Sequence, residues 1–537
     1  MKVKALVVMT LLSACVFAGE PLNQLAAPAE ITKFKPADFS VKYSGEAKNP
    51  FWDAALTGEF MAPSGRKIPV EGFFNGDGVY TVRFCPAEAG SYAYSLVFKK
   101  DKFEQRFAGS FTAAGSESRG FLRVSKENCF RFVTDDNKPF YPLGIQTCGA
   151  EGMPSTLVAG NKTEQVSKEK YFKLHSGGAN VFRVQLGAGE KSGCAIDVLS
   201  FGKKDEYNLE ALKALDELYS VLLKNGFHSI TILMQDMSRW GSGAQGFGGI
   251  RDTAGYKDLK NKEAAGYVKK YFSYITARYG AYTDIWEIFN EDDFAPDEWL
   301  NEMAGYIKSK DPYSHLMTTN FERPYLDWCD LVTPHEYMYW DECGVDIYLS
   351  KELCRFKHFK KPVFYTEFGN QAVCGNMGRN KWRVAVWSSF FNEGALLFWD
   401  ETNFRHVSGL PARPANAFLG PEERSDFMSF SKFVEDIPVT ARPVSVYCAQ
   451  ESEIRGYGLR AEDKIYVYLN HITSHMHEIK GLNLTVDADP GKWEIAWIEP
   501  LTGDILQEEK AETAGKTINM TIPKIRSDLA AVLTRVK

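Results

Sequence analysis

The pattern of apolar and polar residues divides the chain into three regions. In residues 28–115, short apolar runs such as 80–84 and 92–98 alternate with Gly, Pro and Asp, which is typical of strands joined by turns. Residues 75–78 read Asn-Gly-Asp-Gly and predict a tight turn between two of these strands. This region is therefore predicted to be an antiparallel β-sandwich.

From residue 120 to residue 437 the pattern changes to strands that alternate with helices. Amphipathic stretches at 209–224 and 264–279 predict two of the helices. Eight apolar runs predict strands, at 141–146, 181–186, 229–235, 285–290, 316–320, 331–334, 363–366 and 395–399. Such alternation indicates a parallel sheet, and eight strand–helix units match a (β/α)8 TIM barrel with insertions. A doubly wound sheet is the alternative, but it usually has fewer strands.

After residue 437 the helical pattern disappears. Apolar runs at 464–469, 492–498 and 517–522 indicate strands again. Residues 438–537 are therefore predicted to form a second antiparallel β-sandwich. The expected fold class is a multidomain protein in which a TIM barrel is flanked by a β-sandwich on each side.

Residues 1–18 have the pattern of a secretory signal peptide. Two lysines precede an apolar run that is too short to span a bilayer and remain there. Cleavage after Ala18 suits an ordinary signal peptidase, whereas Leu-Ser-Ala-Cys at 12–15 resembles a bacterial lipoprotein box and would make Cys15 a lipid anchor. Both alternatives predict export from a bacterial cell, to the periplasm, the medium or the outer surface. No other run is long enough for a membrane span.

Composition excludes several classes of protein. With 44% hydrophobic and 25% charged residues in 537, the chain as a whole is neither disordered nor fibrous. A net charge of −6 without a basic tract lacks the electrostatic signature of a nucleic-acid partner. Besides Cys15 there are nine cysteines without CxxC spacing, which argues against zinc, thioredoxin-like and disulfide-framework classes.

Two glutamates stand at the ends of predicted strands. Glu291 follows the fourth strand, and Glu367 ends the seventh. The carboxyl ends of the strands carry the chemistry of a TIM barrel. Two carboxylates facing each other across that end are what retaining glycoside hydrolysis needs, because one protonates the leaving group and the other attacks the anomeric carbon.

These positions resemble the clan A glycoside hydrolases, a large group of retaining TIM-barrel enzymes that includes cellulase-, mannanase- and galactosidase-like members. Asn290 and Glu291 match the Asn-Glu pair of the clan's fourth strand. The resemblance implies that Glu291 is the acid/base and that Asn290 donates to the sugar 2-hydroxyl. It also implies that Glu367 is the nucleophile.

Four further residues match the clan in chain order. Arg183 stands where many members carry an arginine, and His335 and Tyr337 match a His-x-Tyr motif whose tyrosine donates to the nucleophile. Trp399 resembles the tryptophan that floors the sugar subsite. Three of them also have a structural alternative: Arg183 as the ion-pair partner of Glu287, and His335 and Trp399 as core residues. The N-terminal region also resembles an Ig-like module that precedes such barrels in secreted bacterial enzymes.

Other residues near the third strand are candidates for substrate contact. Gln235, Asp236 and Trp240 are predicted to border the mouth of the barrel. Residues 292–293 are Asp-Asp, where many clan members have proline, which leaves the sugar open. A GxGxxG pattern at 241–246 lies past its strand, outside a βαβ unit, and is interpreted as a loop over the site. No metal-ligand spacing is present, so neither a metal nor an organic cofactor is expected.

The sequence therefore predicts a secreted retaining β-glycosidase. It would hydrolyse β-linked oligo- or polysaccharides by double displacement through a covalent glycosyl-enzyme. Two alternatives stay open: a non-catalytic carbohydrate-binding surface protein on the same barrel, and a transglycosidase in which a second sugar replaces water. In each case the expected partner is a carbohydrate.

Overall fold

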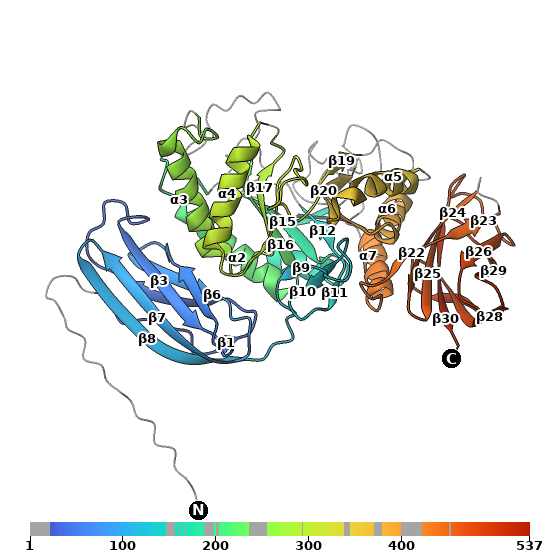
Figure 1. Cartoon of the computed structure of the whole chain (residues 1–537), viewed down its shortest axis with the longest axis horizontal. Helices are drawn as coiled ribbons and strands as arrows, with labels where there is room; N and C mark the ends of the chain where they lie inside the picture. Colours follow the sequence, from blue (N-terminus) through green and yellow to red (C-terminus); the bar gives the residue numbers. More distant parts are fainter. Residues whose placement is uncertain are drawn as a thin grey trace, which may run out of the picture.

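The structure is a computed structural model, and three regions follow one another along its long axis (Figure 1). It describes residues 22–146, 156–159, 162–165, 167–186, 198–199, 203–235, 255–292, 294–337, 344–369, 379–398, 421–449 and 453–536. The predicted signal peptide, with Cys15, lies outside these residues. The chain is a multidomain protein built around one parallel sheet, with further, mostly antiparallel sheets on either side.

The N-terminal region is a pair of facing sheets, ordered β1-β8-β7-β3-β4 and β2-β6-β5. Their strands are β1 (Ile31–Thr32), β2 (Ala37–Lys42), β3 (Ala54–Met61), β4 (Lys67–Glu71), β5 (Phe73–Phe74), β6 (Val79–Phe84), β7 (Gly90–Lys100) and β8 (Phe103–Ala114). The rings of Phe39 and Phe60, one from each sheet, pack 5.3 Å apart. The predicted turn joins β5 to β6, with Gly76 and Gly78 at positive φ. One prediction was wrong in detail, since β1 pairs parallel, not antiparallel, with β8.

The central region contains eight strands that all run parallel, ordered β18-β17-β16-β15-β12-β21-β20-β19. They are β12 (Leu143–Ile145), β15 (Val181–Gln185), β16 (His228–Gln235), β17 (Ile285–Asn290), β18 (Leu316–Thr318), β19 (His335–Tyr337), β20 (Val363–Gly369) and β21 (Gly394–Phe398). Neighbours in the sheet are successive in the chain, and the first strand pairs with the eighth. In the described residues no ladder joins β18 to β19, although Asn320 Nδ2 donates to the Thr333 oxygen at 2.6 Å.

Helices connect most of these strands, but β18 and β19 are joined by residues 319–334 without a helix, so the fifth of the predicted strand–helix units lacks its helix. The helices are α1 (Lys168–His175), α2 (Leu209–Lys224), α3 (Lys262–Tyr279), α4 (Asp297–Lys310), α5 (Val345–Phe356), α6 (Arg379–Phe391) and α7 (Pro421–Val434), with a short turn η4 (Lys357–Phe359) and a hairpin of β13 (Thr156–Ala159) and β14 (Lys162–Gln165). Helix α2 has the predicted bounds, because Asn208 caps its first turn and its apolar residues recur at helical spacing.

The sixth strand is displaced from its predicted position. Residues 331–334 were predicted, but within them only Val332 makes an isolated bridge, and the ladder starts at His335. Pro334 has no N–H to donate, so the pairing is interrupted there. Because side chains alternate along a strand, His335 and Tyr337 share one face, while Glu336 accepts a hydrogen bond from Tyr348 of α5 at 2.5 Å.

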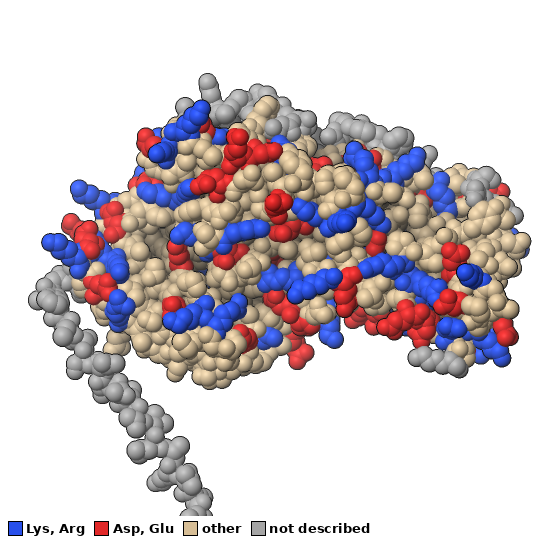
Figure 2. All heavy atoms as spheres, viewed as in Figure 1, with Lys and Arg blue, Asp and Glu red and all other residues tan. Residues whose placement is uncertain are grey.

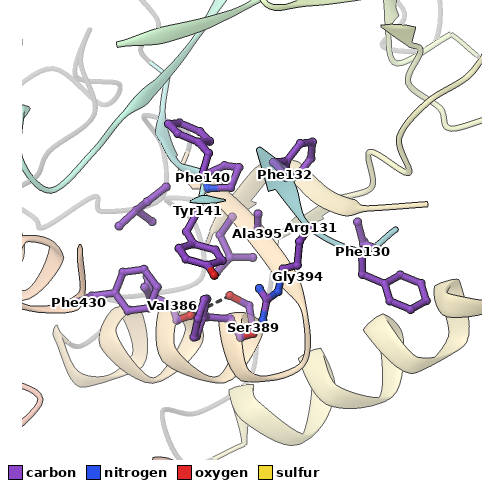
Figure 3. Close-up of a pocket in the computed structure, with 15 residues that line it drawn as sticks. Phe130, Arg131, Phe132, Phe140, Tyr141, Val386, Ser389, Gly394, Ala395 and Phe430 are labelled. Carbon is purple, nitrogen blue, oxygen red and sulfur yellow. Dashed lines mark hydrogen bonds between the residues drawn. The ribbon is translucent and has the colours of Figure 1, made fainter. Parts of the chain in front are cut away.

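A small antiparallel sheet that the sequence did not reveal covers the amino-terminal end of the parallel strands. It consists of β9 (Leu122–Val124), β10 (Phe132–Thr134) and β11 (Pro139–Phe140), which are too short for a period-2 pattern to show. Leu122 and Phe132 pack against Val181 and Ile285, the first residues of β15 and β17. Behind this sheet a cavity of about 20 Å³ lies between Tyr141 and α6 (Figure 3), with room for about one water molecule.

The C-terminal region is a second pair of sheets, ordered β22-β24-β25-β30-β27-β28 and β23-β26-β29. The strands are β22 (Arg442–Val444), β23 (Val446–Cys448), β24 (Ile454–Ala461), β25 (Lys464–His471), β26 (Asn483–Asp487), β27 (Gly491–Ile498), β28 (Ile505–Thr513), β29 (Thr517–Thr521) and β30 (Asp528–Arg535). All their pairings are antiparallel in the described residues, as predicted. Trp493 and Trp497 are fully buried between the two sheets.

Ion pairs of two buried arginines attach both flanking regions to the central one. On the N-terminal side, Arg83 of β6 donates to Asp38 at 2.7 Å and to Asp216 of α2 at 3.1 Å. On the C-terminal side, Arg383 of α6 donates to Asp528 of β30 at 2.7 and 2.9 Å. Burial opposes ionisation of Asp528, but Arg383 and the hydroxyls of its neighbours outweigh it, so the pKa of Asp528 lies below its usual range.

Asp528→Asn is expected to lower the free energy of unfolding at pH 7 by about 3–5 kcal/mol, because the guanidinium of Arg383 loses its charged partner in the interior. A depressed carboxyl pKa stabilises the fold fully above its unfolded value of about 3.9, and this contribution is lost as the pH falls. The difference between the wild type and the variant should therefore shrink between pH 6 and pH 3 in calorimetry. A constant difference would contradict the assignment; Asp504→Asn, at an exposed turn, is the control.

The outer surface carries no single-sign area on the face shown in Figure 2, where basic and acidic side chains are interspersed. No helix within the described residues is long and apolar enough to cross a membrane. Three of the described cysteines, Cys85, Cys329 and Cys448, are buried as small apolar groups.

Candidate active site

Six of the residues predicted from the sequence meet at the carboxyl ends of the parallel strands. They are Arg183 of β15, Asn290 of β17, Glu291 directly after it, His335 and Tyr337 of β19, and Glu367 of β20. Because the strands are parallel, residues more than a hundred positions apart come to the same edge.

Arg183 is at the centre of this cluster. It is 1% exposed, and its Nε and Nη2 donate to Glu287 at 2.8 and 2.5 Å. Nη1 donates to Glu367 Oε1 at 2.6 Å and to Gln146 at 3.0 Å, while Nη2 also donates to Asn290 Oδ1 at 2.7 Å. Burial disfavours the charge of Arg183, yet the two carboxylates outweigh it and raise its pKa. The predicted ion pair with Glu287 is confirmed.

Glu367 is held by donors on both of its oxygens. Arg183 donates to Oε1, and the Tyr337 hydroxyl donates to Oε2. Burial and the neighbouring Glu367 raise the pKa of Tyr337 well above its usual value, so its hydroxyl keeps its proton and remains a donor. The carboxylate of Glu367 is therefore fixed in position and compensated by a positive charge.

Glu291, directly after β17, has a left-handed backbone conformation. Its φ is 52°, a conformation that costs energy for a side chain other than glycine and that occurs at functional sites. The next residue, Asp292, holds this turn: its N–H donates to the Asn320 oxygen at 2.9 Å, and its buried carboxylate pairs with Lys257. A proline at this position could make neither this hydrogen bond nor this ion pair.

Glu291 and Glu367 face each other across His335. Nδ1 of His335 lies 3.0 Å from Glu291 Oε1 and 3.5 Å from Glu367 Oε2, and one ligand atom of each residue lies within 4.8 Å of the others. The side chain of Glu291 is 13% exposed and that of Glu367 only 5%. The carboxylate of Glu291 is thus somewhat more exposed than that of Glu367, which accepts hydrogen bonds on both of its oxygens.

These three side chains are also the one group in the described part of the chain whose ligand atoms are close enough for a metal ion. The guanidinium of Arg183 already compensates the charge of Glu367 at 2.6 Å. This arrangement favours carboxylates that are held by hydrogen bonds to protein side chains over carboxylates that bind a divalent cation.

The side-chain positions of four predicted site residues are not described. Trp240, Asp236 and Trp399 lie outside the described residues, as does the GxGxxG segment at 241–246. The backbone of Gln235 pairs with Asn290 in the sheet, but its side chain is not described.

The structure adds glutamines that the sequence analysis missed. Gln146 ends the first parallel strand, and its Oε1 accepts from Arg183. Gln146 Nε2, Gln185 Oε1 and His335 Nε2 are buried without a hydrogen-bond partner among the described residues. A polar residue at the carboxyl end of a predicted apolar strand was the available signal. Buried polar atoms of this kind are satisfied by a bound ligand or by water.

Tyr337→Phe is expected to lower kcat about 10- to 100-fold on any substrate that this site turns over. A hydrogen bond to a charged group contributes about 1.5–3 kcal/mol, and each 1.4 kcal/mol corresponds to a factor of ten. Tyr141→Phe is the matched control, because its buried hydroxyl donates to a neutral backbone oxygen at the opposite end of the sheet. Steady-state kinetics of both variants test this prediction. An equal loss of kcat in the two variants would mean that Tyr337 has no specific role.

Known proteins show similarity mainly in fold. A sequence family described only as a domain of unknown function, DUF5060, matches residues 30–99. No curated protein matches the chain. A candidate glycoside hydrolase from Bacteroides vulgatus has a similar structure, with a TM-score of 0.69 at 17% identity over 94% of this chain and 100% of that one.

Two other solved structures overlap less well. They are an endo-β-1,4-mannanase from Thermotoga petrophila (TM-score 0.39, 14% identity, 71% of this chain and 98% of that one) and a type I pullulanase from Bacillus subtilis (0.45, 10%, 96% and 86%). Both overlaps are too weak to support an argument. At 17% identity, the similarity to the Bacteroides structure defines the fold alone.

Proposed function

We propose that this protein is an exported retaining β-glycosidase of the clan A type. Glu367 would attack the anomeric carbon and form a covalent glycosyl-enzyme. Glu291 would first give its proton to the leaving oxygen and then take a proton from the water that releases the sugar. The eight parallel strands would close into a (β/α)8 barrel, whose first and eighth strands already pair.

The observation that carries this proposal is the short separation of two unlike carboxylates. Oxygens of Glu291 and Glu367 approach within 4.8 Å. Inverting enzymes separate the carboxyl groups by about 6.5–9.5 Å to admit a water molecule, whereas retaining enzymes hold them at about 5–5.5 Å. The surroundings of the two carboxylates support the same assignment of roles, because Glu367 is enclosed and paired with Arg183, which suits a nucleophile.

The surrounding residues would support each step. Arg183 and Tyr337 donate to the two oxygens of Glu367 and hold its carboxylate in position. Because Asn290 Oδ1 accepts from Arg183, its Nδ2 is oriented to donate to a substrate hydroxyl. Such a hydrogen bond to the 2-hydroxyl would strengthen in the oxocarbenium-like transition state.

Two further sources support the proposal at a coarser level. The structure that resembles this one over nearly its whole length is described as that of a candidate glycoside hydrolase. Export rests on the sequence pattern of residues 1–18, with signal-peptidase cleavage or lipidation at Cys15 as the two routes.

The test is hydrolysis of a panel of β-linked polysaccharides, oligosaccharides and aryl glycosides by the purified protein. We expect release of a sugar from at least one member, and proton NMR should show a β-anomer as the first product. An α-anomer would overturn the retaining mechanism. Binding of glycans without turnover would favour the carbohydrate-binding protein, and sugar transfer to acceptors in preference to water would indicate a transglycosidase.

A further inference from the structure

Two exposed aromatic side chains follow the ends of neighbouring parallel strands. Phe294 lies between β17 and α4 and is 66% exposed, and Tyr325 follows β18 and is 58% exposed. Single exposed apolar side chains are common on protein surfaces, so it is the position of these two beside the carboxylates that distinguishes them. Both loops lie at the end of the sheet that carries the two carboxylates.

Phe294 follows Glu291 closely in the sequence. Only two residues separate them, so their Cα atoms are at most about 11 Å apart. Asp292 accepts hydrogen bonds from the N–H groups of Phe294 and Ala295 at 2.7 and 3.0 Å. Because Asp292 is itself buried, the backbone that presents the Phe294 ring is held in place.

Tyr325 is tied to the same segment. Its hydroxyl donates to Asp297 Oδ1 at 3.3 Å, and Arg323 lies 3.5 Å from the same oxygen. Asp297 is the first residue of α4, three positions after Phe294. The two loops are thus connected, and the tyrosine is anchored by its hydroxyl while most of its surface stays open.

We propose that Phe294 and Tyr325 form a platform for a sugar ring of the leaving group. The acid/base Glu291 must contact the oxygen of the leaving group, so side chains beside it face that part of the substrate, whereas Glu367 faces the sugar that is transferred. Flat aromatic faces offer apolar surface to the C–H faces of a sugar. The substrate is then an oligo- or polysaccharide, cut between two sugars. This inference rests on the proposed function.

The test compares two substrates that carry the same glycosyl group. One is an oligosaccharide from the panel, and the other is the corresponding glycosyl fluoride, whose leaving group does not extend to the platform. We expect Phe294→Ala and Tyr325→Ala each to lower the ratio of kcat/KM for the oligosaccharide to that for the fluoride roughly 3- to 10-fold. Phe294→Tyr and Tyr325→Phe keep the flat face and should retain the ratio.

The control is Tyr447→Ala, because Tyr447 is an aromatic residue on β23 of the C-terminal region with 53% exposure. An unchanged ratio in the two alanine variants would overturn the platform, as would equal losses on both substrates. If the wild type cleaves neither substrate, the proposed function fails. The platform is then judged by calorimetric binding of the same oligosaccharide, where equal affinity of the wild type and the double alanine variant overturns it.

Discussion

Replacing Glu367 by glutamine is expected to lower kcat roughly 10⁴- to 10⁶-fold, the range seen when a covalent nucleophile or its direct partner is removed. The amide has the same shape but cannot attack the anomeric carbon. Arg183 keeps its ion pair with Glu287 in the variant, so the site should remain folded. Kinetics on the best substrate of the panel measure the loss, and thermal unfolding checks the fold.

A matched control for this variant is Glu393→Gln. Glu393 is equally buried and pairs with Lys357 at 2.7 Å and Asn128 at 2.9 Å, but it precedes β21 at the amino-terminal end of the sheet. This substitution should lower stability and leave kcat unchanged. Substantial activity in Glu367→Gln, or an equal loss in the control, would show that Glu367 is not the nucleophile.

Glu291→Ala is expected to act differently on good and poor leaving groups. General acid and base catalysis contributes about 10²–10⁴-fold, so hydrolysis of an oligosaccharide should fall by that factor. An activated aryl glycoside leaves without protonation, so its first step should remain fast and a glycosyl-enzyme should accumulate. Mass spectrometry of the variant would then show one added glycosyl group on Glu367.

Azide provides a second readout for this variant. A small anionic nucleophile needs no general base, so it should release the trapped sugar and restore turnover of the activated substrate. The same addition should leave Glu367→Gln inactive, because no glycosyl-enzyme forms there. If Glu291→Ala affects all substrates equally and azide changes nothing, Glu291 is not the acid/base.

The differences between the two carboxylates explain why these two variants should differ. Glu367 is enclosed and held on both oxygens, whereas Glu291 is more open and contacts His335. A nucleophile benefits from a fixed and charged carboxylate, and a group that exchanges protons with water benefits from access to solvent. These different surroundings are the basis for the separate roles proposed for the two residues.

Much of the fold could be predicted from the sequence, because the signals were local. Alternation of apolar and polar residues marked the strands of both flanking regions, and a capped, periodic stretch marked α2. The failures had local causes too. Pro334 interrupted the sixth strand, and β9 to β11 are only two or three residues long, too short for any period.

The candidate residues were also visible in the sequence, whereas their arrangement was not. A glutamate at the end of an apolar run is a local feature, and it identified Glu291 and Glu367. The guanidinium of Arg183 donates hydrogen bonds to Gln146, Glu287 and Glu367. These residues lie 37, 104 and 184 positions from it in the chain, respectively.

The sequence by itself therefore determined which residue types stand at the strand ends. The tertiary structure decided which of them touch, how far apart the two carboxylates lie, and which one is enclosed. The physical reason is that strand alternation acts over two residues, whereas distances across the sheet depend on how distant strands pack and pair.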